Sequence, residues 1–102
     1  MIHVIATIEV VAGKRDVFLA EFHRNVPKVL GEDGCLEYGP TLDLATGIGA
    51  QIPLRENVVT IVEKWASLDA LRAHLVAPHM TEYRERVKGL VVGVKLQVLQ
   101  PA

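Results

Sequence analysis

Two histidines and one glutamate are the residues of this sequence best suited to acid–base chemistry. His74 and His79 are five positions apart with a proline between them, and Glu63 lies in a stretch of alternating apolar residues. An imidazole titrates near neutral pH, so either histidine could act as a general base. A carboxyl among apolar neighbours has a raised pKa and could also exchange protons. The alternative is that all three have structural roles: the histidines as helix caps or surface residues beside a turn, and Glu63 as the partner of an arginine or a backbone amide at the end of the strand.

Three aromatic residues could form a pocket wall around these groups. Trp65 follows Glu63 by two positions, so both side chains point to one face if the segment is a strand. Trp65 could there stack on a planar substrate, and Tyr38 and Tyr83 could direct their hydroxyls into a cavity. All three also fit an ordinary hydrophobic core.

The spacing of the candidate ligands argues against a metal site. A helical zinc site has its histidines four positions apart, whereas these are five apart and no third ligand is nearby in the sequence. The single cysteine, Cys35, can form neither an internal disulfide nor a zinc knuckle. Gly47 and Gly49 resemble part of a phosphate loop, but no helix is predicted after them. We therefore expect no metal and no cofactor.

The periodicity of apolar residues predicts one α+β domain covering residues 1–102. In chain order we expect a strand over 2–10, a helix ending near Leu30, strands over 35–44 and 57–65, a short helix capped by Ser67, a helix starting at Pro78 and a strand over 91–99. This is the split βαβ order of the ferredoxin-like fold, βαββαβ with an antiparallel sheet. Pro40 predicts an edge or bulged second strand. The loop over 45–56 is a candidate lid or packing arm.

Both faces of the predicted third strand are apolar. Val59 and Ile61 point to the face shared with Glu63, whereas Val58 and Val62 point to the other face. Helices cover only one face of such a sheet, so the second face would be an apolar surface in water. We expect a homodimer in which two sheets face each other across a two-fold axis. The alternative is a set of isolated surface valines.

Composition excludes several classes of partner. The 102 residues are 50% hydrophobic and 23% charged, which is typical of a folded globular protein, and the net charge of −1 offers no basic surface for nucleic acid. No apolar run approaches the length of a membrane span, and the N-terminal residues lack a basic leader. With one cysteine, the sequence favours a cytoplasmic protein without nucleic-acid or membrane partners.

Four short segments occur together in one order: Val10-x-x-Gly13-Lys14, Gly34-Cys35-x-x-Tyr38, Glu63-Lys64-Trp65 and His74-Leu75-x-x-Pro78-His79. In these segments the chain resembles the antibiotic biosynthesis monooxygenase superfamily, in particular its small quinol monooxygenase-like branch. The resemblance implies a dimeric α/β barrel with a cavity between sheet and helices in each subunit. It also implies oxygenation of a phenolic or quinol-like substrate without metal or flavin, with Glu63, Trp65, His74 and His79 lining or supporting the cavity. The haem-degrading branch has an asparagine where this chain has Ala6, which argues against haem.

Three functional hypotheses follow from these residues. The first is a cofactor-independent monooxygenase that oxidises a small aromatic quinol or phenol with O₂, with His79 or His74 as base, Glu63 orienting it and Trp65 stacking on the substrate. A deprotonated hydroquinone can pass an electron to O₂ directly, so the protein supplies a base, an apolar pocket and groups that hold the anion. The second is a non-redox isomerase or ligand-binding module that uses the same cavity. The third is a dimer without catalysis.

Overall fold

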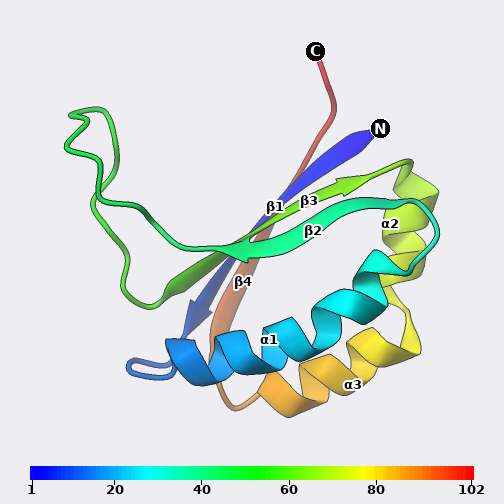
Figure 1. Ribbon diagram of the computed structural model, residues 1–102, viewed down its shortest axis with the longest axis horizontal. Helices are drawn as coiled ribbons and strands as arrows, with labels where there is room; N and C mark the ends of the chain where they lie inside the picture. The colour runs from blue at the N-terminus through cyan, green and yellow to red at the C-terminus, as the bar shows by residue number, and fades with distance from the viewer.

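Four strands and three helices follow one another in the predicted order in the computed structural model, which describes residues 1–102 (Figure 1). The elements are β1 (Ile2–Val10), α1 (Arg15–Leu30), β2 (Cys35–Thr41), β3 (Val58–Trp65), α2 (Leu68–Leu75), α3 (Pro78–Val87) and β4 (Val91–Leu99). The ferredoxin-like α+β fold is therefore confirmed. The second strand ends at Thr41, three residues earlier than the sequence predicts.

The strands form one antiparallel sheet in the order β2-β3-β1-β4. The strand β2, which contains Pro40, lies at an edge as predicted, where a missing backbone donor costs no ladder hydrogen bond on the open side. Its register shift lies between Cys35 and Glu37 rather than at the proline. Glu63 pairs with Tyr38 on one side and with Val4 on the other, so these residues form one row across the sheet.

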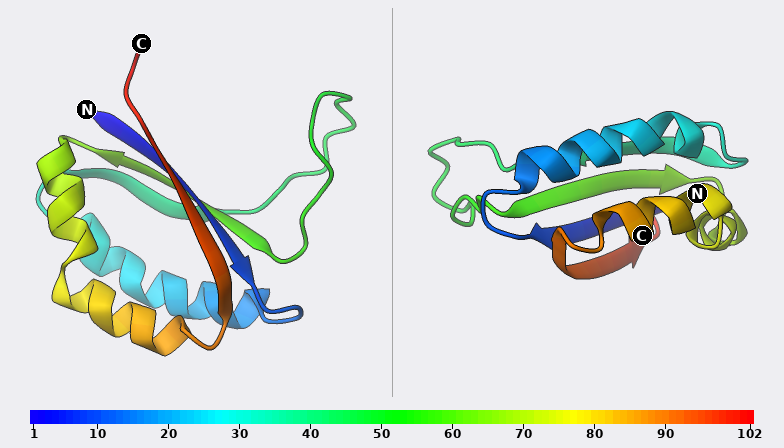
Figure 2. Two further views of the ribbon diagram at one scale, coloured as in Figure 1. Left: turned by 180° about the vertical axis from the view of Figure 1, so that it is seen from behind. Right: turned by 90° about the horizontal axis from the view of Figure 1, so that it is seen from below.

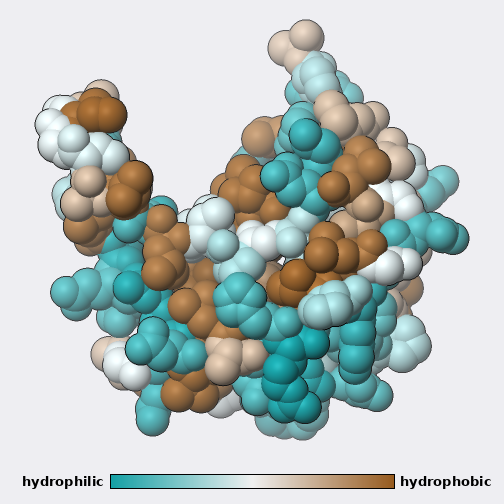
Figure 3. All heavy atoms as spheres, viewed as in Figure 1, coloured by the Kyte–Doolittle hydropathy of each residue, from teal (hydrophilic) through white to brown (hydrophobic).

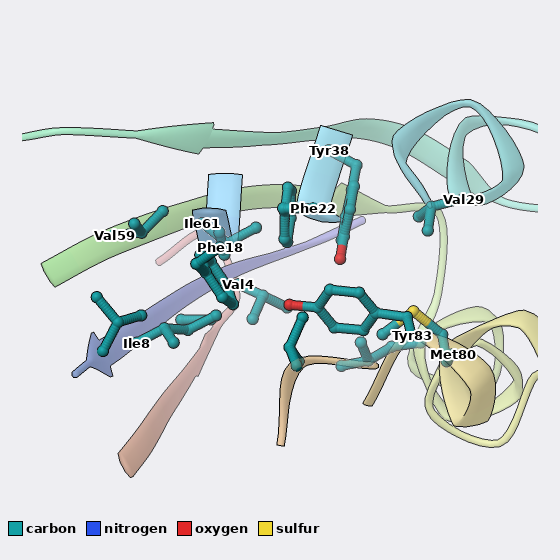
Figure 4. Close-up of a cluster of buried hydrophobic side chains, with 14 of the residues drawn as sticks. Val4, Ile8, Phe18, Phe22, Val29, Tyr38, Val59, Ile61, Met80 and Tyr83 are labelled. Atoms are coloured by element: carbon teal, nitrogen blue, oxygen red, sulfur yellow. The ribbon is translucent and has the colours of Figure 1, made fainter. Parts of the chain in front are cut away.

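All three helices lie on one side of the sheet (Figures 1 and 2). Burial along β3 alternates strictly: Val59, Ile61, Glu63 and Trp65 are buried under the helices, whereas the residues between them are half-buried on the other face. The face that the sequence predicts for Glu63 and Trp65 is thus confirmed. From α1, Phe18 and Phe22 enter this core at helical spacing (Figure 4). Burying each phenyl group contributes about 2 kcal/mol.

The helices leave one part of the sheet uncovered on their own side. Residues Val94, Leu96 and Val98 of β4 pair with the buried row of β1, yet each is exposed. The helix α1 packs on β2 and beside α3, so neither helix reaches across β4. An open apolar strip therefore remains between α3 and the β4 edge.

Residues 42–57 form an arm without regular structure, which projects away from the helices at the β2 edge (Figure 1). A bidentate ion pair closes its base: Arg55 Nη2 and Nε each lie 2.9 Å from a different carboxylate oxygen of Asp43. The hydrogen bonds from Arg55 lower the pKa of Asp43 to about 2. Exposed apolar side chains occupy the arm, namely Leu42, Leu44, Ile48, Ile52 and Leu54. In Figure 3 a hollow separates this arm from the C-terminal end of the chain.

No helix has the length and apolar character needed to cross a membrane.

Candidate active site

A cavity of about 400 Å³ lies between the sheet and α3, at the strip that the helices leave open. Its wall is mostly hydrophobic and consists of Ala6, Ile8, Phe22, Tyr38, Ile61, Glu63, His74, Leu75, Met80, Tyr83, Arg84, Val87, Lys88, Val91, Val94 and Leu96. This volume suits a small organic molecule, and the few polar groups in an apolar wall are typical of a ligand site. Four of the six residues singled out in the sequence line it: Tyr38, Glu63, His74 and Tyr83.

Glu63 places a carboxyl group in the apolar wall of the cavity. Its side chain is only 6% exposed, and one oxygen accepts a hydrogen bond of 2.9 Å from Trp65 Nε1. Burial raises the pKa of Glu63 to about 7, although the bond from Trp65 acts in the opposite direction. The carboxyl can therefore give or take a proton near neutral pH.

His74 brings an imidazole to the same wall. It lies at the end of α2, is 2% exposed, and its Nδ1 is 2.9 Å from Glu32 Oε2. Burial lowers the pKa of His74, and the bond to Glu32 only partly offsets this. The ring is therefore neutral at neutral pH. With Nδ1–H donating to the carboxylate, Nε2 is the basic nitrogen.

Three aromatic rings, those of Phe22, Tyr38 and Tyr83, belong to the same wall as these two groups, and Figure 4 shows them packed together. Phe22 stacks on Tyr38 with ring centroids 5.3 Å apart, and Tyr83 meets Phe22 edge-on at 5.8 Å. Both tyrosine side chains extend into the region between β2 and α3. Burial raises the pKa of each phenol, so both hydroxyls stay protonated and can donate hydrogen bonds to a ligand.

Two sequence-predicted residues lie outside the cavity wall. The side chain of Trp65 is fully buried, and the centroid of its ring lies 4.6 Å from the centroid of the His74 ring. Trp65 therefore packs against the imidazole and has no free face on which a substrate could stack. His79 lies at the start of α3 and contacts Glu32 at 2.7 Å instead of the cavity. Trp65 is thus a core residue and is not placed to stack on a substrate, as the sequence had suggested it could be.

The carboxylate that orients the histidines is Glu32, not Glu63 as the sequence suggested. Glu32 Oε2 lies within hydrogen-bond distance of both rings, whereas Glu63 is bonded to Trp65. Sequence reasoning missed Glu32 because an acidic residue between Gly31 and Gly34 looks like an ordinary solvated turn residue. The only available signal was its place just before the Gly34-Cys35 segment.

No group of three or more His, Cys, Asp or Glu side chains is arranged to hold a metal ion. Around Glu32, both imidazole nitrogens are directed at one carboxylate oxygen rather than at a common point in space.

Comparison with known proteins assigns the family. The model of the antibiotic biosynthesis monooxygenase family matches residues 1–86. The chain belongs to this family. It is 41% identical over 103 residues to the probable quinol monooxygenase YgiN of Escherichia coli (strain K12), with 99% of this chain and 98% of that protein covered. The YgiN protein of Shigella flexneri matches to the same extent. The resemblance stated from the four sequence segments is thereby confirmed, and the family supports a monooxygenase function.

Solved structures show the same fold. PA3566 from Pseudomonas aeruginosa superposes with a TM-score of 0.80 at 23% identity, covering 99% of this chain and 93% of that one. Rv0793 from Mycobacterium tuberculosis gives a TM-score of 0.80 at 24% identity, covering 99% and 94%. At this identity the likeness concerns the fold alone.

Proposed function

We propose that the chain is a cofactor-independent monooxygenase that oxidises a small aromatic quinol or phenol with O₂. The observation that carries the proposal is a mostly apolar cavity in which a proton-exchanging carboxyl, Glu63, and a neutral imidazole, His74, share one wall. The name of the Escherichia coli relative supports the same substrate class. An apolar wall also admits O₂ and a planar ring.

The proposed reaction begins when a base removes a phenolic proton and the quinolate passes one electron to O₂. The semiquinone and superoxide then combine, which forms a bond between a ring carbon and oxygen, and the resulting peroxide is protonated. A base next takes the hydrogen of that ring carbon while the O–O bond breaks, and the departing oxygen is protonated and leaves as water. One quinol and one O₂ thus give one hydroxyquinone and one water.

The wall residues divide these tasks. His74 Nε2 is the proposed base, because His74 lines the cavity and His79 does not. Glu63 and the two tyrosine hydroxyls hold the oxygens of the substrate. Arg84 on α3 and Lys88, the residue that follows this helix, place positive charge at the cavity and favour the quinolate anion.

We further propose that the chain acts in the cytoplasm as a single-domain homodimer, with the face of the sheet opposite the helices as the interface. The half-buried Val58 and Val62 lie on this face. The arm of residues 42–57 rises beside it with exposed apolar side chains (Figures 1 and 3). A second copy is the simplest cover for both.

Oxygen uptake with a panel of hydroquinones and anthrones tests the activity. We expect uptake above the autoxidation rate, one O₂ per substrate, and one atom of ¹⁸O₂ in the product. His74→Gln should lower kcat about a hundredfold or more, whereas His23→Gln, which changes an exposed histidine of α1, should have no effect. Absence of uptake above background with every substrate would refute the proposal. Conversion of a substrate under argon would instead favour an isomerase.

A further inference from the structure

One carboxylate oxygen joins two histidines from different helices. Glu32 lies in the turn between α1 and β2, and its Oε2 is 2.9 Å from His74 Nδ1 at the end of α2 and 2.7 Å from His79 Nε2 at the start of α3. These partners are 42 and 47 residues further along the chain. The reaction proposed above assigns work only to His74, so the other two residues need a separate explanation.

The three groups lead from the cavity wall toward the surface. The exposed fraction of the side chain rises from 2% for His74 to 13% for Glu32 and 22% for His79. His74 lines the cavity, whereas neither Glu32 nor His79 does. Each neighbouring pair is within hydrogen-bond distance, so the series is continuous from the cavity to solvent.

Tight packing holds the turn that carries Glu32 against the helix that carries His74. Gly34 has a φ of +81°, and a Cβ atom there would lie 2.6 Å from the Cβ of Ala70 on α2. The Gly34 carbonyl also accepts a hydrogen bond of 2.7 Å from the backbone N–H of Ala66. The position of Glu32 between the two rings is therefore determined by the backbone and not only by side-chain rotamers.

We propose that Glu32 and His79 form a proton relay that connects the cavity-facing His74 with solvent. The proposal rests on the proposed function, in which one base must take two protons in each turnover, first from a phenolic oxygen and later from a ring carbon. His74 accepts the first proton at Nε2, its Nδ1 proton passes to Glu32 Oε2, a proton passes from Glu32 to His79 Nε2, and His79 releases its Nδ1 proton to water. His74 is then neutral, with its proton on Nε2. When His74 protonates the peroxide from Nε2, these transfers run in reverse and return a proton to Nδ1, so Nε2 can accept the second proton. Glu32 and His79 are thus positioning residues for proton transfer.

The histidine titrations test the relay without any substrate. In ¹⁵N NMR of the wild-type protein we expect the signals of His74 to respond to the protonation of His79, because Glu32 joins them. Glu32→Gln should abolish this response, whereas Glu82→Gln, which removes an exposed carboxylate of α3 outside the network, should leave it intact. Independent titration of the two rings in the wild-type protein would overturn the proposal.

Kinetics separates a relay from a merely structural role. His79→Ala should lower kcat about tenfold or more with KM nearly unchanged, because chemistry slows and substrate binding does not. Added imidazole should restore kcat in His79→Ala, since a soluble base can replace a proton acceptor near the surface. An unchanged kcat, or a reduced kcat that imidazole does not restore, would refute the relay. If the wild-type protein oxidises no quinol, the proposed function fails, and the NMR titration alone decides whether the network transmits protonation.

Discussion

Replacing Glu63 by Gln should change how the stability of the protein depends on pH. In the folded protein burial raises the pKa of Glu63 from 4.5 to about 7, so the folded state binds more protons than the unfolded chain between these values. The free energy of unfolding of the wild-type protein therefore falls as pH rises through this window. A shift of ~2.5 pKa units corresponds to about 3 kcal/mol. Gln keeps an oxygen that can accept the Trp65 hydrogen bond but cannot ionise.

Urea unfolding of both proteins at one protomer concentration measures the effect. The difference in free energy of unfolding, Glu63→Gln minus wild type, should increase by up to about 3 kcal/mol between about pH 4.5 and about pH 8.5. All other titrating groups are common to the two proteins and cancel in the difference. Glu82→Gln provides the control, because its carboxylate is exposed in both states. A difference that stays constant over this range would show that water reaches the Glu63 carboxyl and that its pKa is not raised by burial in the cavity wall.

Three further substitutions examine the turn, the cavity and the interface. Gly34→Ala should destabilise the protein by about 2 kcal/mol or more in thermal or urea unfolding, because it combines a left-handed φ with a contact against Ala70; a loss below about 0.5 kcal/mol would contradict this packing. Tyr38→Phe keeps the ring that stacks on Phe22, so KM for a quinol should rise while stability changes by less than about 1 kcal/mol; an unchanged KM would show that the hydroxyl does not bind substrate. Val62→Asp should convert a dimer into a monomer in light scattering, and an unchanged mass would place the interface elsewhere.

The parts of the fold that depend on local pattern could be predicted from the sequence. Alternation along β3 is a property of neighbouring residues, so the common face of Glu63 and Trp65 follows from their spacing alone. The edge position of β2 follows in the same way from Pro40, whose missing N–H excludes it from a central strand.

The contacts of the candidate site depend on distant residues and could not be read from spacing. Glu32 meets His74 only because the turn after α1 packs on α2, a contact between segments about forty residues apart. A strand pattern likewise tells which face Trp65 takes but not how deeply it is buried. The close packing of its ring against His74, which depends on the distant helix α2, makes Trp65 a core residue and not part of the cavity wall.

The ion pair at the base of the 42–57 arm has a consequence for assembly. Asp43 and Arg55 hold the two ends of the arm together, and Gln51 bonds to the Leu44 carbonyl and to Thr46 within it. A segment that is already shaped in the free subunit loses little conformational entropy when another surface covers it. Because the pKa of Asp43 is about 2, this preorganisation persists through mildly acidic pH. Between neutral and mildly acidic pH, protonation of Asp43 would therefore not loosen the arm or weaken a contact that depends on its shape.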